Sequence, residues 1–76
     1  MAKHRILEMS VDSWEDAIRM ARDESTRCKQ TVWAIEYRER PSVDGMCFYE
    51  ICGPSTLAML QVQYDTVRLE SFVPAR

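Results

Sequence analysis

Apolar and polar positions alternate near the N-terminus with the period of a strand. Leu7, Met9 and Val11 are apolar, and polar residues separate them. Because successive side chains of a strand point to opposite faces, this alternation places the apolar residues on one face. Residues 5–11 are therefore predicted to form a half-buried strand.

The next segment has the spacing of an amphipathic helix. Asp12 and Ser13 carry side-chain oxygens that can accept hydrogen bonds from the first free amides of a helix. At 100° per residue, a stripe of apolar and small residues lies opposite a charged side. The stripe consists of Trp14, Ala17, Ile18, Ala21, Ser25 and Cys28, and the charged side of Glu15, Arg19, Arg22, Asp23 and Arg27. We expect the stripe to pack on a sheet and the charged side to face solvent.

Two segments rich in β-formers follow, separated by a turn. Residues 31–40 contain many β-branched and aromatic residues and are predicted to form a strand. One face would consist of Trp33, Ile35 and Tyr37, and the other of Val32, Ala34, Glu36 and Arg38. Pro41 and the turn dipeptide Asp44-Gly45 come next, so residues 46–52 should return antiparallel.

The returning segment, residues 46–52, is apolar on both of its faces except at Glu50. One face would carry Met46, Phe48 and Cys52, and the other Cys47, Tyr49 and Ile51. A strand of this kind is either central in its sheet or meets another subunit with its second face.

Two patterns overlap in the C-terminal part of the chain. The Leu-Ala-Met-Leu run at residues 57–60 consists of good helix formers, yet Leu60, Val62 and Tyr64 alternate strictly with glutamines. We interpret residues 57–64 as a strand. A further alternation at residues 67–73 predicts a last strand, which ends before a proline.

Together these elements predict one α+β domain over residues 1–76, with the order β-α-β-β-β-β and one helix packed on one face of a small antiparallel sheet. A chain of 76 residues leaves little room for a core, so disulfides, a metal or oligomerisation would normally add stability. One helix can cover only one sheet face. We therefore expect a homodimer or a complex with another protein, with Tyr37, Phe48 and Tyr49 at the interface.

The three cysteines do not indicate a disulfide or a metal site. Cys28, Cys47 and Cys52 are odd in number and lack the paired spacing of zinc ligands. Cys47 and Cys52 would also point to opposite faces of one strand. We expect three reduced thiols and no bound metal.

Charge and the N-terminal sequence restrict the cellular role. The chain has 10 basic and 12 acidic residues, a net charge of −2 and a pI near 5.3. An acidic balance disfavours coating of nucleic acid or of a membrane surface, since both need a basic field. The N-terminal residues include no long apolar run that would form a signal peptide or membrane span. We expect a cytoplasmic protein.

No residue pattern indicates catalysis. The single histidine, His4, lies near the N-terminus, where a catalytic base is rarely held in fixed geometry. Gly45 and Gly53 are isolated, so there is no glycine-rich loop to hold phosphate. Aromatic residues of the sheet could stack on bases, but no basic cluster accompanies them. We expect neither an enzyme nor a nucleic-acid-binding protein.

Trp14 and Trp33 have two interpretations: both belong to the core, or one stands at an interface or stacks on a flat ligand. The second interpretation is connected with a family resemblance. The segments that carry it are Ser13-Trp14-Glu15-Asp16-Ala17, Val32-Trp33-Ala34, Asp44-Gly45 and Tyr49-Glu50-Ile51. Together they resemble the dodecins, small flavin-binding β-α-β-β proteins that assemble into hollow dodecamers.

The resemblance spans about half the chain and implies a flavin site. Trp33 would stack on the isoalloxazine ring, and Glu50 would stand near the position where the family has a glutamine. An ionised glutamate accepts hydrogen bonds but cannot donate them. Gly53-Pro54 would also interrupt the family's third strand.

The leading functional hypothesis is a non-enzymatic protein that binds another protein through the sheet face its helix leaves uncovered. Short acidic chains without motifs resemble, in size and character, the small inhibitors made by phages and mobile elements, anti-CRISPR proteins included. Such an inhibitor of a host complex would act by steric blocking. The alternative is a dodecin-like protein that binds or stores flavin.

Overall fold

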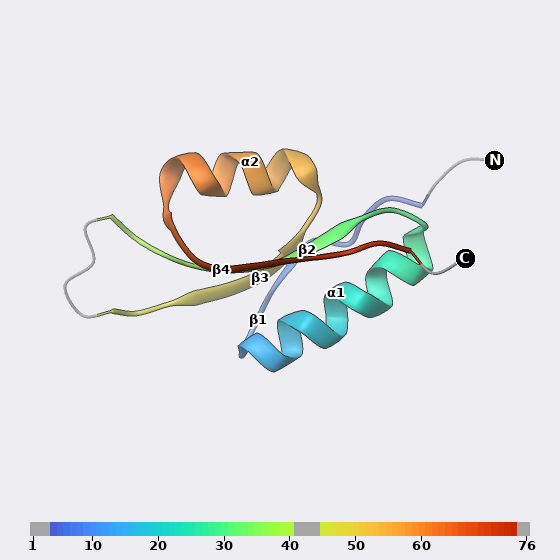
Figure 1. Cartoon of the computed structure of the whole chain (residues 1–76), viewed down its shortest axis with the longest axis horizontal. Helices are drawn as coiled ribbons and strands as arrows, with labels where there is room; N and C mark the ends of the chain where they lie inside the picture. The colour runs from blue at the N-terminus through green and yellow to red at the C-terminus, as the bar shows by residue number, and fades with distance from the viewer. Residues whose placement is uncertain (1–3, 41–44, 75–76) are drawn as a thin grey trace.

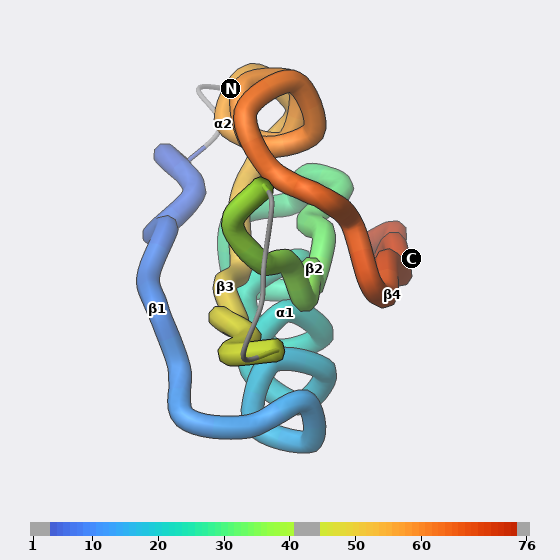
Figure 2. The backbone as a smooth tube through the Cα atoms, turned by 90° about the vertical axis from the view of Figure 1, so that its left-hand side faces the viewer, coloured from blue at the N-terminus to red at the C-terminus, as the bar shows by residue number. Residues whose placement is uncertain are grey.

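The computed structural model describes residues 4–40 and 45–74. Within these residues, four antiparallel strands form one sheet, with a helix on each face (Figure 1). The elements are β1 (Met9–Val11), α1 (Trp14–Cys28), β2 (Val32–Arg38), β3 (Phe48–Cys52), α2 (Pro54–Gln63) and β4 (Asp65–Phe72). The strand order is β1-β3-β2-β4. Figure 2 shows α1 and α2 on opposite sides of the strands. The predicted α+β class with an antiparallel sheet is confirmed.

The capping and stripe predicted for α1 are confirmed in most positions. The Ser13 side chain accepts a hydrogen bond from the Asp16 amide at 3.1 Å, and Lys29 ends the helix in a left-handed conformation with φ 59°. Four stripe residues are buried, namely Ala17, Ala21, Ser25 and Cys28. Ile18 is only half-buried, at the margin of the stripe.

The segment predicted as a strand at residues 57–64 is helical, so that prediction was wrong. Gly53 is the N-cap and Pro54 begins the helix, where its missing N–H costs nothing and its fixed φ suits the first turn. Leu57 and Leu60, three residues apart, point together into the core. Val62 is 75% exposed, so the alternation of apolar residues did not mark one face of a strand.

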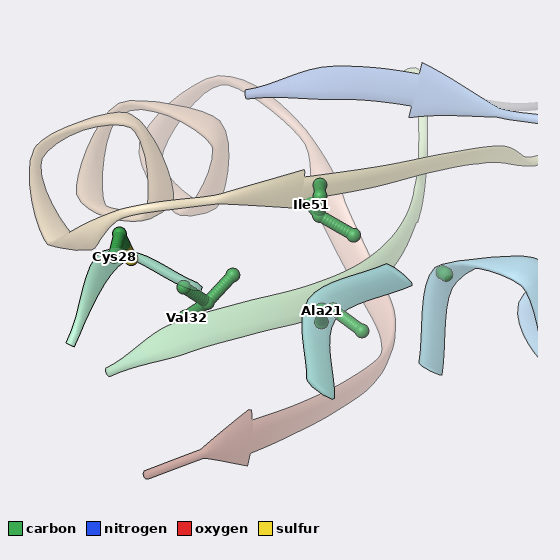
Figure 3. Close-up of a cluster of buried hydrophobic side chains, with 6 residues drawn as sticks. Ala21, Cys28, Val32 and Ile51 are labelled. Atoms are coloured by element: carbon green, nitrogen blue, oxygen red, sulfur yellow. The ribbon is translucent and has the colours of Figure 1, made fainter. Parts of the chain in front are cut away.

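The first core cluster fills the space between α1 and the sheet. It consists of Ala17, Ala21, Cys28, Val32, Ala34 and Ile51. Figure 3 shows members of this cluster from α1, β2 and β3. The small alanines of α1 allow the helix to lie close to the sheet, which suits a chain with little apolar volume.

The second core cluster lies on the opposite sheet face, under α2. It consists of Ile35, Tyr37, Cys52, Leu57 and Leu60, with Trp33 and Tyr64 packed against it. The predicted division of β2 into two faces is therefore confirmed, but the expected single helix was wrong because α2 packs on the second face. The area of this face under α2 is therefore not open to a partner.

β3 lies between β1 and β2, as the apolar character of both its faces predicted. Tyr37 is opposite Phe48, and Trp33 is opposite Cys52. β1 is shorter than predicted and has only three residues. Pro41 and Asp44 of the predicted turn lie outside the described residues, while Gly45 has a positive φ of 73°, which glycine adopts without strain.

Glu8 connects the N-terminal segment to the start of α2. Its carboxylate accepts hydrogen bonds from the Gly53 amide at 2.7 Å and from the Thr56 hydroxyl at 2.9 Å. Gly53 has no side chain with which to cap the helix, so a carboxylate distant in sequence supplies negative charge at the helix N-terminus. No helix within residues 4–40 and 45–74 is both long and apolar enough to cross a membrane.

Candidate functional site

Trp33 and Glu50, the two residues of the predicted flavin site, lie on the same sheet face. Trp33 is opposite Cys52, and Glu50 is two residues earlier on the same strand. The Trp33 ring is half-buried against the second core cluster, which α2 closes. The Glu50 carboxylate already accepts a hydrogen bond from the Tyr37 hydroxyl at 2.9 Å. The core role of Trp33 therefore has direct structural support, and the flavin role stays a prediction.

The structure does not bring the three predicted interface residues to one surface. Tyr37 and Phe48 are on the face that carries α2, with ring centroids 5.7 Å apart. Phe48 is 38% exposed, whereas Tyr37 is buried and also contacts the ring of Tyr64. Tyr49 lies on the opposite face and packs against the first core cluster. Of the three, Phe48 has the most surface to offer a partner.

Burial raises the pKa of Tyr37, and its hydrogen bond to Glu50 raises that pKa further. The hydroxyl therefore stays protonated at neutral pH and acts as a hydrogen-bond donor. A buried tyrosine that donates to a carboxylate satisfies both polar groups. This contact stabilises the sheet and offers no catalytic base.

A buried carboxylate on the α1 side of the sheet is the main polar feature that the sequence analysis did not identify. Glu36 is 5% exposed and accepts a hydrogen bond from Arg68 Nε at 2.6 Å. The Arg68 guanidinium also lies 4.9 Å from the centroid of the Trp14 ring, in a cation–π contact. An acidic residue on the core face of β2 was a signal that a cation must lie nearby.

Burial alone would raise the pKa of Glu36, but hydrogen bonds outweigh it and the pKa is lowered. Arg68 gives the largest lowering, and the Cys47 thiol and Tyr49 hydroxyl add to it. For Cys47 itself, burial and the nearby Glu36 carboxylate raise the pKa, and its Sγ donates to the Gly45 carbonyl at 3.5 Å. The thiol is therefore held in its unreactive protonated form. This cluster is an ion pair, and it lacks an activated nucleophile.

The cysteines and carboxylates do not gather into a metal site in the described part of the chain, where no group of three metal-binding side chains occurs. Cys28, Cys47 and Cys52 are all free thiols. Burial raises the pKa of Cys52 to about 12. Cys28 and Cys52 are fully buried and serve as small apolar residues of the two clusters.

The outer face of α2 is exposed and carries no charge. We call this surface the α2 outer face; it consists of Ser55, Ala58, Met59 and Val62, all of them exposed. Charged residues make up 29% of the chain, yet residues 51–64 include none. In α1, by contrast, seven of the 15 residues are charged.

The uncharged run at residues 51–64 is visible in the sequence. Because residues 57–64 were interpreted as a strand, an exposed outer side of a helix was not expected there, although half of the run is exposed. Met59 is 49% and Val62 is 75% exposed, while Leu57 and Leu60 on the inner side are buried. A surface helix normally has a polar outer side. The α2 outer face is therefore the best candidate for a binding surface. Searches against protein-family models, curated proteins and solved structures gave no match to this chain.

Proposed function

We propose that this protein is a non-enzymatic module that binds another protein through the α2 outer face. The observation that carries the proposal is that an exposed helix has no charged residue and presents Met59 and Val62 outward. The cores of protein interfaces are depleted in charged residues and enriched in methionine. Burial of these side chains on a partner would contribute about 25 cal/mol for each Å² of apolar surface.

The chemistry of α2 also indicates what kind of partner it fits. The helix itself has no cation, and the Arg40 guanidinium at its C-terminal end is paired with Asp65 and donates to the Gln61 and Tyr64 carbonyls, so the α2 outer face has no cation of its own to contact phosphate. Gln61 and Gln63 are exposed next to the apolar residues and can both donate and accept hydrogen bonds. The complementary surface is an uncharged apolar groove of a protein, with neutral polar groups at its rim.

A module of this size acts on its partner by occupying a surface. The polar clusters described above lack an activated nucleophile, so we infer steric blocking as the mode of action. This is the mode expected of a small phage or mobile-element inhibitor, such as an anti-CRISPR protein. The blocking element would be α2. From the sequence we expected the uncovered sheet face in this role.

The experiment compares two variants that add the same charge at equally exposed valines. Val62→Lys alters the α2 outer face, and Val73→Lys alters a residue after β4; the two side chains are 75% and 72% exposed. Tagged proteins are used to capture partners from a host lysate at equal concentration. We expect one stoichiometric partner that wild type and Val73→Lys retain and that Val62→Lys loses. Equal retention by both variants, or no stoichiometric partner for wild type, would contradict the proposal.

One observation favours the flavin-binding alternative: Trp33 and Glu50 share a sheet face. Its test is the visible absorbance spectrum of the purified protein after incubation with riboflavin and gel filtration. Flavin that co-elutes with wild type, and not with Trp33→Leu, would support it. The dodecin-like alternative fails if wild type elutes without flavin.

A further inference from the structure

β4 is an edge of the sheet, and it is long and exposed. It spans Asp65–Phe72, and all residues from 66 to 71 are exposed. In the portion of the chain that the structure covers, β4 pairs with β2 and with no strand on its other side. Figure 2 shows it at the margin of the sheet, opposite β1. Such an edge presents backbone N–H and C=O groups that can pair with another strand.

β4 is only partly protected as an edge strand. Proteins protect edges with short strands, prolines, bulges or charged side chains, lysine above all. The opposite edge, β1, has only three residues, whereas β4 has eight and includes neither proline nor lysine. Its one irregularity lies opposite Glu36 and Tyr37, so residues 68–72 continue as a regular strand. This regular part can accept a further strand.

We propose that a second copy of this chain pairs antiparallel with β4, with each Leu69 opposite the Leu69 of the other copy. Two identical antiparallel strands are related by a two-fold axis perpendicular to the sheet, so one residue lies opposite its own symmetry mate. With Leu69 on the axis, Arg68 lies opposite Glu70 of the second copy. The symmetry repeats this pair on the other side of the axis.

Charge selects this register over its two neighbours. An axis at Arg68 would place two arginines directly opposite each other, and an axis at Glu70 would do the same with two glutamates. Like charges in directly opposite positions are destabilising, whereas opposite charges stabilise the pair. The Leu69 register forms two ion pairs. It also covers Leu69, which is 42% exposed in the single copy.

Both charged partners can form the new pair without giving up an existing contact. Glu70 is opposite Ala34 in β2 and makes no ion pair within the described residues. Arg68 uses its Nε–H on Glu36, and a guanidinium has further N–H donors. The dimer also places both α2 helices on the same side of the joined sheet, so it leaves the α2 outer faces outside the strand contact.

The first test is a disulfide across the proposed axis. In a Cys47→Ser background, Leu69→Cys places two cysteines directly opposite, where Cα atoms are about 4.5–5.5 Å apart and a disulfide can form. Ser71→Cys is the matched control, because residue 71 lies opposite residue 67 of the second copy. Under mild oxidation we expect a covalent dimer for Leu69→Cys and a monomer for Ser71→Cys. Equal cross-linking of the two, or a monomeric Leu69→Cys, would overturn the proposal.

The second test measures dimerisation without cysteine changes. Glu70→Arg replaces both ion pairs by like charges and should weaken dimerisation about tenfold or more in sedimentation equilibrium. Glu39→Arg makes the same change at an exposed residue outside β4 and should leave the dimer unchanged. Equal dimerisation by both variants contradicts the register. Glu70→Arg keeps the α2 outer face intact, so partner capture through α2 is tested separately.

Discussion

Arg68 Nε donates a hydrogen bond to Glu36 at 2.6 Å and so pairs a carboxylate that the sheet and α1 almost close off from water. Removal of the Glu36 charge should therefore be costly. We expect Glu36→Gln to lower the free energy of unfolding by about 1.5–3 kcal/mol at neutral pH, measured by urea titration. Glu39→Gln, at an exposed residue, should change it by less than about 0.5 kcal/mol.

The same pair predicts a dependence of stability on pH. The folded-state pKa of Glu36 lies below its ordinary value of 4.5, so its contribution is present above that value and is lost as the pH falls through the lowered pKa. Urea titrations from pH 6 down to about pH 3 should show a smaller loss for Glu36→Gln than for wild type. Some loss remains, because Arg27 holds the pKa of Glu24 low as well. Identical pH profiles would contradict this role of Glu36.

Ala21 marks the centre of the α1 stripe and is fully buried. Ala21→Asp would bury an unpaired charge and should lower the free energy of unfolding by several kcal/mol, enough to unfold a small domain. Ile18→Asp changes a half-buried residue at the margin of the stripe and should lower the free energy of unfolding less. Arg19→Ala removes only an exposed ion pair with Asp16 and should change stability by less than about 0.5 kcal/mol. Circular dichroism melts of the three variants check this order, and a folded Ala21→Asp would contradict it.

The cysteines should react in the order of their exposure. Cys28 and Cys52 are buried, whereas Cys47 is half-exposed. We expect iodoacetamide to label Cys47 first in the folded protein, and slowly, because its pKa is raised and little thiolate forms. Reductant and chelator should leave the melting temperature unchanged. Early labelling of Cys52, seen by mass spectrometry, would show that the core under α2 opens readily.

Glu8 should stabilise α2 from a distance. Glu8→Ala removes the acceptor of the Gly53 amide and the Thr56 hydroxyl and should lower stability by about 1 kcal/mol, as loss of a helix cap does. Glu39→Ala serves as the control without such contacts. Urea titration measures both. If Glu8→Ala and Glu39→Ala are equally stable, the N-terminal segment does not hold α2 in solution.

The elements that were predictable had long and regular patterns. Ser13, Ala17 and Ala21 identify the start and inner side of α1, and the alternation in β2 separates Trp33 from Ala34 on opposite faces. α2 was missed because its apolar residues surround the helix, with Leu57 inside and Val62 outside. A helix without a polar side shows no apolar stripe in its sequence. The short alternation of Leu60, Val62 and Tyr64 with glutamines was therefore interpreted as a strand.

The residues that meet in the candidate sites could not be predicted without knowing which strands are neighbours in the sheet. Glu36 and Arg68 meet because β4 pairs with β2, although β3 and α2 separate them in the chain. Local patterns do not specify such long-range pairing. The alternation in residues 46–52 already placed Tyr49 on the face opposite Phe48, and the register of β3 against β2 confirms that placement, so one sheet face could not present both residues to a partner.

β2 is buried on both faces and has a hydrogen-bonded neighbour on each side. Its amide protons are therefore shielded by α1, by α2 and by two strands, and their exchange with deuterated water should be the slowest in the molecule. Neither helix can detach without exposing one side of this strand. We therefore expect the two cores to unfold together. A substitution that detaches α2 should also expose β2 and speed the exchange of amide protons on the side that α1 covers.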